Sequence, residues 1–124
     1  MKQLFLEDLK EMTDQDVRKH IVSRYEVIEE IVDKYKILIA YESVGNWGCD
    51  SASFFLLRNK KSKALFTVTG SHCSCYGFEG QFEPEKVTLD YLKSDKFYFC
   101  CGGYDGSESS NKQEVKYFID HLRI

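Results

Sequence analysis

Three segments rich in β-branched and aromatic residues follow one another between residues 36 and 72, and they constrain the fold more than any other feature. They read KILIAYESV (36–44), SASFFLLR (51–58) and ALFTVTGSH (64–72). Each has the length and composition of a β-strand. The polar stretch NKKSK (59–63) separates the second from the third. We therefore expect these two segments to form an antiparallel hairpin closed by this turn.

Helical signals flank the three strands. Thr13 followed by Asp16 has the spacing of a capping box, and apolar residues at helical spacing then continue to about residue 34, with a candidate break near Ser23. Before this helix, Phe5, Leu6 and Leu9 predict a short amphipathic helix.

The last third of the chain carries further elements. VTLDYLKS (87–94) predicts a short helix and KFYFCC (96–101) a strand. Ser110 and Gln113 have the spacing of a second capping box, and the residues after them predict a C-terminal helix. The order α-α-β-β-β-α-β-α does not alternate regularly, so residues 1–124 are expected to form a single α+β domain. Its sheet is mainly antiparallel with about four strands, and the N-terminal and C-terminal helices pack on it.

Charge and hydropathy exclude several classes of partner. The formal net charge is -3, which is the wrong sign for a broad phosphate-binding surface, so no direct nucleic-acid binding is expected. The basic stretch 58–63 is interpreted as a solvated turn. No apolar run approaches the roughly 18 residues that span a bilayer. The first twelve residues lack the pattern of a signal peptide, so we expect a cytoplasmic protein with no membrane association.

Cysteines gather in two short stretches, GSHCSCYGFEG (70–80) and FYFCCGG (97–103). The chain has five cysteines, an odd number, and disulfides are uncommon in reducing cytosol. If the strand at 64–72 continues through them, Cys73 and Cys75 project from the same face. Metal binding is the favoured interpretation of this pair, with packing as structural thiols and redox or nucleophilic chemistry as alternatives.

Hairpin pairing suggests which residues complete a metal site. Counting from the turn, residues near 50 fall opposite residues near 72, so Cys49 and Asp50 are expected beside His72 and Cys73. A tetrahedral zinc site needs four such ligands, and thiolates favour zinc over magnesium or calcium. We predict one structural zinc per chain. Cys73 and Cys75 are its first two ligands, and the other two come from Cys49, Asp50, His72 and Cys100.

Several cysteines and histidines also have a purely structural or surface interpretation. Cys100 and Cys101 lie among aromatic residues, where a free thiol commonly packs as a small hydrophobe. His20 and His121 are expected to be surface side chains of helices.

A Cys73–His72 catalytic dyad has poor geometry, because neighbours on an extended strand point apart. A small metal- or thiol-dependent enzyme acting on a nucleotide or host protein is the alternative, with Glu79 as its candidate base.

The block from residue 48 to residue 92 carries a further signal. It contains the motif His-Cys-x-Cys-Tyr-Gly-x-Glu-Gly-Gln-aromatic, which spans His72 to Phe82. This block resembles a family of small uncharacterised proteins encoded by bacteriophages and prophages. The resemblance implies a protein made in the cytoplasm of a bacterial host. It is compatible with an anti-CRISPR, a metal-binding inhibitor of a type II CRISPR effector nuclease.

The resemblance thus favours an interaction protein that inhibits a host defence component by stoichiometric binding, with an RNA-guided nuclease as the candidate partner. An acidic segment such as EVIEE (26–30) with Asp33, or DGSESS (105–110), would meet a basic partner surface, although both also suit plain solvated surface. Aromatic residues in glycine-rich loops are candidate contact residues or core caps. They are Trp47, Phe78, Phe82 and Tyr104.

Overall fold

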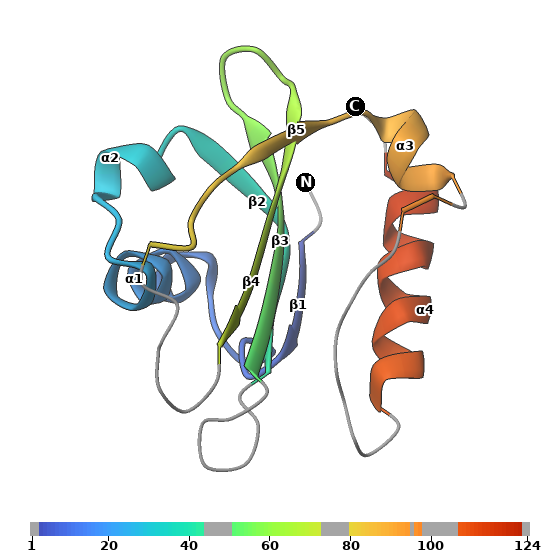
Figure 1. Ribbon diagram of the computed structural model, residues 1–124, viewed down its shortest axis with the longest axis horizontal. Helices are drawn as coiled ribbons and strands as arrows, with labels where there is room; N and C mark the ends of the chain where they lie inside the picture. The colour runs from blue at the N-terminus through green and yellow to red at the C-terminus, as the bar shows by residue number, and fades with distance from the viewer. Residues whose placement is uncertain (1–2, 44–50, 73–79, 95, 98–106, 123–124) are drawn as a thin grey trace.

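The computed structural model describes residues 3–43, 51–72, 80–94, 96–97 and 107–122. Within them the chain forms an α+β fold, as predicted, but the sheet is mixed and has five strands instead of about four. Figure 1 shows the sheet nearly edge-on, with α1 (Asp14–Tyr25) and α2 (Glu29–Val32) on one side. On the other side lie α3 (Leu89–Lys93) and α4 (Ser107–Asp120).

The strands follow one another across the sheet in chain order, β1-β2-β3-β4-β5. β1 and β2 are parallel, and all other neighbours are antiparallel. The β3–β4 hairpin is confirmed, with Ser51 opposite His72 at its open end and Arg58 opposite Leu65 beside the turn. The bounds are β1 (Leu4–Glu7), β2 (Tyr35–Ser43), β3 (Ser51–Asn59), β4 (Leu65–His72) and β5 (Glu85–Val87).

The N-terminal prediction is wrong, because residues 4–7 form a strand and not a helix. Leu6 is buried on the α4 side of the sheet, whereas Phe5 packs toward α1. A strand that is covered on both faces lacks the alternation of apolar and polar residues that identifies strands. A run of three apolar residues is then as consistent with a helix as with a strand. Glu7 then adopts a left-handed conformation (φ 55°) that turns the chain toward the buried Leu9.

The predicted helix from residue 14 to about residue 34 is two helices. Its start is confirmed: the Thr13 hydroxyl accepts a hydrogen bond from the Asp16 amide, and the Asp16 carboxylate accepts one from the Thr13 amide. α1 ends at Tyr25, since Glu26 takes a left-handed conformation (φ 52°) that terminates a helix. The chain resumes as the single turn α2.

The C-terminal elements differ in detail from the expectation. β5 was not predicted, because three residues are too few for a periodic pattern. α3 falls within the predicted 87–94. α4 begins at Ser107, so Ser110 lies inside the helix and does not cap it. Of the predicted strand 96–101, residues 96–97 are a turn and coil, and the remainder lies outside the described residues.

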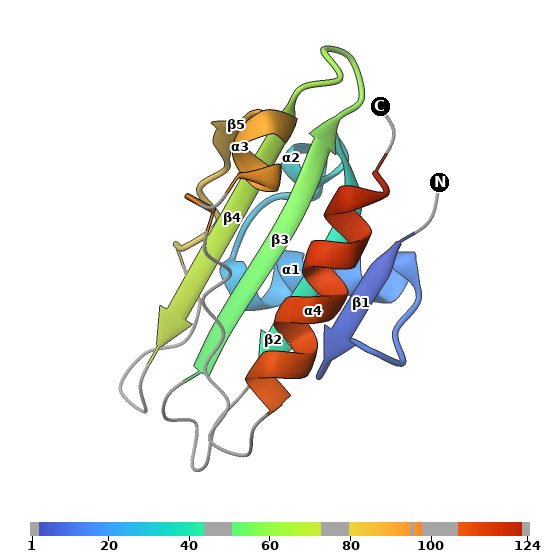
Figure 2. The same cartoon turned by 90° about the vertical axis from the view of Figure 1, so that its right-hand side faces the viewer.

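Two apolar layers hold the domain together, one on each face of the sheet. In Figure 2, α4 lies over β2, between β1 and β3. Its residues Val115 and Ile119 are buried on this face of the sheet, as is Leu122 just after its end. On the opposite face, α1 buries Val17 and Ile21. The β-bulge between Ile37 and Ile39 turns Ile37 toward α1 and both Leu38 and Ile39 toward α4.

Candidate functional site

The open end of the β3–β4 hairpin is where the sequence places its zinc site. Ser51 and His72 are the last partners in the β3–β4 ladder. The strands that lead to Asp50 and Cys73 are therefore neighbours at this end, as the hairpin prediction requires. Of the six candidate ligands only His72 belongs to the described residues. The others lie outside them: Cys49, Asp50, Cys73, Cys75 and Cys100.

No three His, Cys, Asp or Glu side chains within the described part of the chain come close enough together to hold a metal ion. The zinc site thus remains a prediction whose support is the register of the hairpin. Trp47, Phe78, Glu79 and Tyr104 also lie outside the described residues. Phe82 is described, and its ring packs edge-on against Tyr25 with the centroids 6.3 Å apart, so it caps the core on the α1 side.

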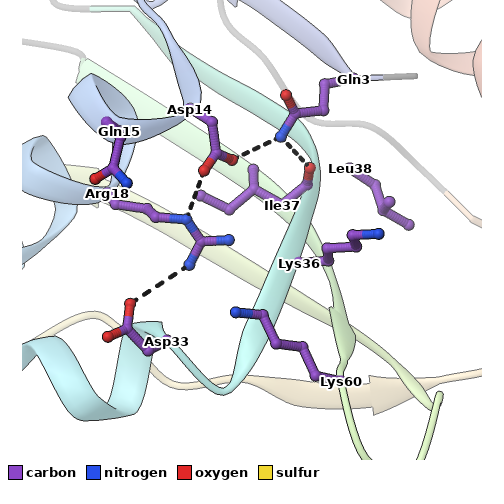
Figure 3. Close-up of a pocket in the computed structure, with 9 residues that line it drawn as sticks. All are labelled: Gln3, Asp14, Gln15, Arg18, Asp33, Lys36, Ile37, Leu38 and Lys60. Atoms are coloured by element: carbon purple, nitrogen blue, oxygen red, sulfur yellow. Dashed lines mark hydrogen bonds and ion pairs between the residues drawn. The ribbon is translucent and has the colours of Figure 1, made fainter. Parts of the chain in front are cut away.

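A polar pocket of about 410 Å³ lies where β2 extends past the end of β1 (Figure 3). β1 pairs with β2 only from Ile39 onward, and the pocket is lined there by Ile37 and Leu38 of β2. The first turns of α1 supply Asp14 and Arg18 to the same pocket.

Arg18 is the centre of this pocket. Its Nε lies 2.8 Å from Asp14 Oδ2, and its two terminal nitrogens donate to the carbonyl oxygens of Val32 (3.2 Å) and Tyr35 (2.8 Å). Asp33 Oδ1 is more distant, at 3.8 Å. One guanidinium thus ties α1 to α2 and to the start of β2. Because these partners already occupy Arg18, it is poorly placed to receive a ligand.

Both carboxylate oxygens of Asp14 also accept hydrogen bonds. Its Oδ1 accepts a hydrogen bond of 2.7 Å from Gln3 Nε2, which also donates to the Ile37 carbonyl at 2.9 Å. Partial burial raises the pKa of Asp14, but the hydrogen bonds from Arg18 and Gln3 and the positive charges of Arg18 and Lys60 outweigh it. The net result is a pKa below the ordinary value of 3.8. The charged side chains of the pocket therefore form a network that covers this edge of the sheet. Lys36 and Lys60 also line the pocket.

A second polar group lies buried between α1 and the sheet. His20 Nε2 and Glu42 Oε2 are 2.7 Å apart, and the two side chains are 15% and 1% exposed. The expectation of a surface His20 is therefore wrong, while His121 is exposed as expected. Glu42 Oε1 is buried and has no hydrogen-bond partner among the described residues.

Tyr25 completes this buried group. Its hydroxyl donates to Ser53 Oγ at 2.5 Å, and Ser53 is the cross-strand neighbour of Glu42. Burial raises the pKa of Tyr25 well above 10.0, and the nearby Glu42 carboxyl adds to the shift, which the Ser53 hydrogen bond only partly offsets. The Tyr25 carbonyl also accepts a hydrogen bond of 3.3 Å from the Gly80 amide. The group therefore links α1, two strands and the segment that follows the HCSC motif.

Two signals in the sequence bear on this group. Glu42 directly follows the apolar run 37–41 of β2, and His20 follows Val17 by three residues, on the side of α1 that faces the sheet. Neither signal identifies the other residue as its partner, because 22 positions separate them.

An apolar residue stands exposed in the acidic turn between α1 and α2. Ile28 is 59% exposed, and the acidic side chains around it in the sequence are exposed as well. These acids are Glu26, Glu29, Glu30 and Asp33. We call this surface the Ile28 corner. It combines the local negative charge that the sequence suggested with one exposed apolar side chain.

The helices that the structure describes are all too short or too polar to cross a bilayer. Comparison of the chain with protein-family models, with curated protein sequences and with solved structures gives no match.

Proposed function

We propose that this chain is a phage-encoded, zinc-binding interaction protein that inhibits a host defence component by stoichiometric binding in the bacterial cytoplasm. A type II CRISPR effector nuclease is the candidate target. The observation that carries the interaction role is the Ile28 corner. An apolar side chain that is exposed over more than half its surface, in a segment of the chain that also carries exposed carboxylates, suits a partner that presents basic groups near an apolar contact.

Charge supports this choice of partner. Nuclease surfaces that hold nucleic acid are basic, and complementary charge accelerates encounter and fixes orientation. The net charge of -3 is too small for mimicry of DNA by the whole molecule. A local acidic surface is sufficient to occupy part of a basic channel.

The zinc ion has a structural role in this proposal. The Ser51–His72 register supports it, since Ser51 and His72, which adjoin Asp50 and Cys73 in the sequence, are partners at one end of the sheet. Binding of zinc there would contribute directly to folding, because the unfolded chain has no such site. Such an ion would join the open end of the hairpin to the HCSC stretch, which supplies Cys73 and Cys75.

The test is inhibition of purified effector nuclease as the molar ratio of this protein is varied. Inhibition that is complete near one protein per nuclease, with co-elution of the two, is the expected result. The variant Glu29→Lys/Glu30→Lys should weaken inhibition at least tenfold. The matched control Glu114→Lys/Asp120→Lys, on exposed positions of α4, changes the net charge equally and should not.

The enzyme alternative gives a different titration. A catalyst would inactivate the nuclease at a small fraction of its concentration, and substitution of Glu79 or His72 would abolish the effect while leaving the fold intact. Absence of any effect on a panel of type II effectors would remove the CRISPR assignment.

A further inference from the structure

A second groove, on the α4 side of the sheet, has a composition that the zinc site and the Ile28 corner do not explain. It has a volume of about 540 Å³ and lies between β4, β5 and α3. Aromatic rings from three separate segments line it: Phe54 of β3, Tyr91 of α3, and Phe97. Two carboxylates, Glu83 and Glu85, line it as well.

The strand register explains why acids and aromatic rings meet there. Thr67 is opposite Leu56 on one side and opposite Glu85 on the other, so these three residues share one face of the sheet. Leu56 packs on the α4 side together with Phe54. Glu83 precedes β5 and lines the same groove. Lys86 also borders the groove, but it is paired with Phe66, which packs on the α1 side.

The three aromatic rings of the groove are in contact through Phe97. The Phe97 ring lies 5.9 Å from that of Phe54 and 6.0 Å from that of Tyr91, the latter pair in an edge-to-face arrangement. Tyr91 is 42% exposed even so. The N-terminus of α3 is capped, because the Thr88 hydroxyl accepts a hydrogen bond from the Tyr91 amide. The exposed Tyr91 ring is thus held beside negative charge, with the partly exposed Phe97 next to it and the buried Phe54 behind.

The two carboxylates are available to a ligand. Neither Glu83 nor Glu85 forms an ion pair or a side-chain hydrogen bond with any residue that the structure describes. The acidic and basic side chains that line the groove are these two glutamates and Lys86, so its formal charge is one negative. In this respect the groove differs from the pocket around Arg18, whose acids are already paired.

We propose that this groove binds the guanidinium group of an arginine side chain presented by a protein partner. A guanidinium stacks on aromatic rings and donates two parallel hydrogen bonds to a carboxylate, which matches rings and acids that line one cavity. An ammonium would use the charge but not the planar stacking. The inference deepens the proposed function by naming the partner's chemistry, since basic nucleic-acid-binding surfaces are rich in arginine.

The test uses arginine itself, so that it does not depend on the identity of the partner. N-acetyl-L-arginine amide is titrated into the isotopically labelled full-length protein and followed by amide chemical shifts. We expect saturable binding in the millimolar range, with the largest shifts at residues 83–91. N-acetyl-L-citrulline amide, which has nearly the same shape without the charge, should bind at least tenfold more weakly, and the lysine analogue should be intermediate.

Variants decide whether the groove is responsible. Tyr91→Ala and Glu85→Gln should each weaken arginine binding at least about fivefold, and the second is conservative enough to leave the fold unchanged. Tyr117→Ala and Glu114→Gln are the controls, because they remove an exposed tyrosine and an exposed acid from α4, outside the groove. Equal loss in the controls would mean diffuse attraction by acidic surface and would overturn the proposal.

Two further outcomes separate this inference from the proposed function. Lack of saturation by arginine, or equal binding of citrulline, would overturn the groove assignment even if the protein inhibits a nuclease. Arginine binding with these variant effects would sustain the groove even if no nuclease is inhibited.

Discussion

The imidazole of His20 on α1 and the carboxyl of Glu42 on β2 lie 2.7 Å apart inside the domain, with Glu42 almost wholly removed from solvent. A buried polar atom that loses its partner costs more than the hydrogen bond contributed, because it cannot turn to water. This contact is therefore a sensitive point of the α1–sheet interface.

Replacement of His20 by leucine should lower the free energy of unfolding by about 2–3 kcal/mol, because Glu42 Oε2 is left buried and unpaired. The double variant His20→Leu/Glu42→Leu should be more stable than His20→Leu alone, since both polar partners are then gone. Urea denaturation measures both values. His121→Leu, at an exposed position just after α4, serves as the control and should cost clearly less than His20→Leu, because its hydrogen bond to the Tyr117 carbonyl is exposed to water. A double variant less stable than the single one would contradict the pairing.

Alkaline pH should destabilise the wild-type protein through Tyr25. Its pKa is raised in the folded state, so the folded protein keeps a proton that the unfolded chain loses above pH 10.0. The resulting stabilisation is complete below pH 10.0 and is lost as the pH rises toward the folded pKa, by up to about 1.4 kcal/mol per pH unit. Denaturant titrations between pH 9 and pH 11 should show a shallower decline for Tyr25→Phe. An identical slope in the variant would exclude Tyr25 as the source.

Asp14 has the opposite dependence. Its pKa is depressed in the folded state, so its contribution is present above the ordinary value of 3.8 and is lost as the pH falls through the folded value. Thermal denaturation from pH 6 to pH 2 should show a steeper loss for the wild type than for Asp14→Asn. The effect should be modest, because the Asp14 side chain is 37% exposed and solvent screens it. Parallel curves would mean that Arg18 gains nothing from the charge of Asp14.

Zinc can be tested by elemental analysis of protein purified without chelator or nickel resin. We expect about one zinc per chain in the wild type and loss of it in Cys73→Ser and Cys75→Ser, with a sharply lower melting temperature. Cys101→Ser is the matched control, since that residue is expected to pack and not to ligate. A metal-free protein that melts normally, or unchanged melting in both variants, would contradict the structural site.

The hairpin was predictable because its information is local. Two apolar segments and the polar turn between them determine the pairing, and the observed partners Ser51 and His72 agree with a count from the turn. β1 was not predictable in the same way, because its identity as a strand depends on the distant residues 39–42 of β2 and on burial of both its faces. Short elements with long-range partners carry little signal of their own.

The candidate sites differ in the same respect. The Cys-x-Cys pair is visible from sequence because its spacing alone has chemical meaning. The contact between His20 and Glu42 depends on which side of α1 meets which position of β2, and the groove beside Tyr91 depends on three segments converging across the sheet. Sequence periodicity places such residues on a face, but it does not choose the partner.

The side chains of Gln3 and Arg18 have a consequence for the protein at high concentration. β2 extends beyond its pairing with β1, and its outward carbonyls at Tyr35 and Ile37 are occupied by these two side chains. A bare strand edge would offer those carbonyls to the backbone of another molecule, which is the first step of edge-to-edge aggregation. Here two side chains from the same chain occupy these acceptors, which disfavours pairing of this stretch with the backbone of another molecule.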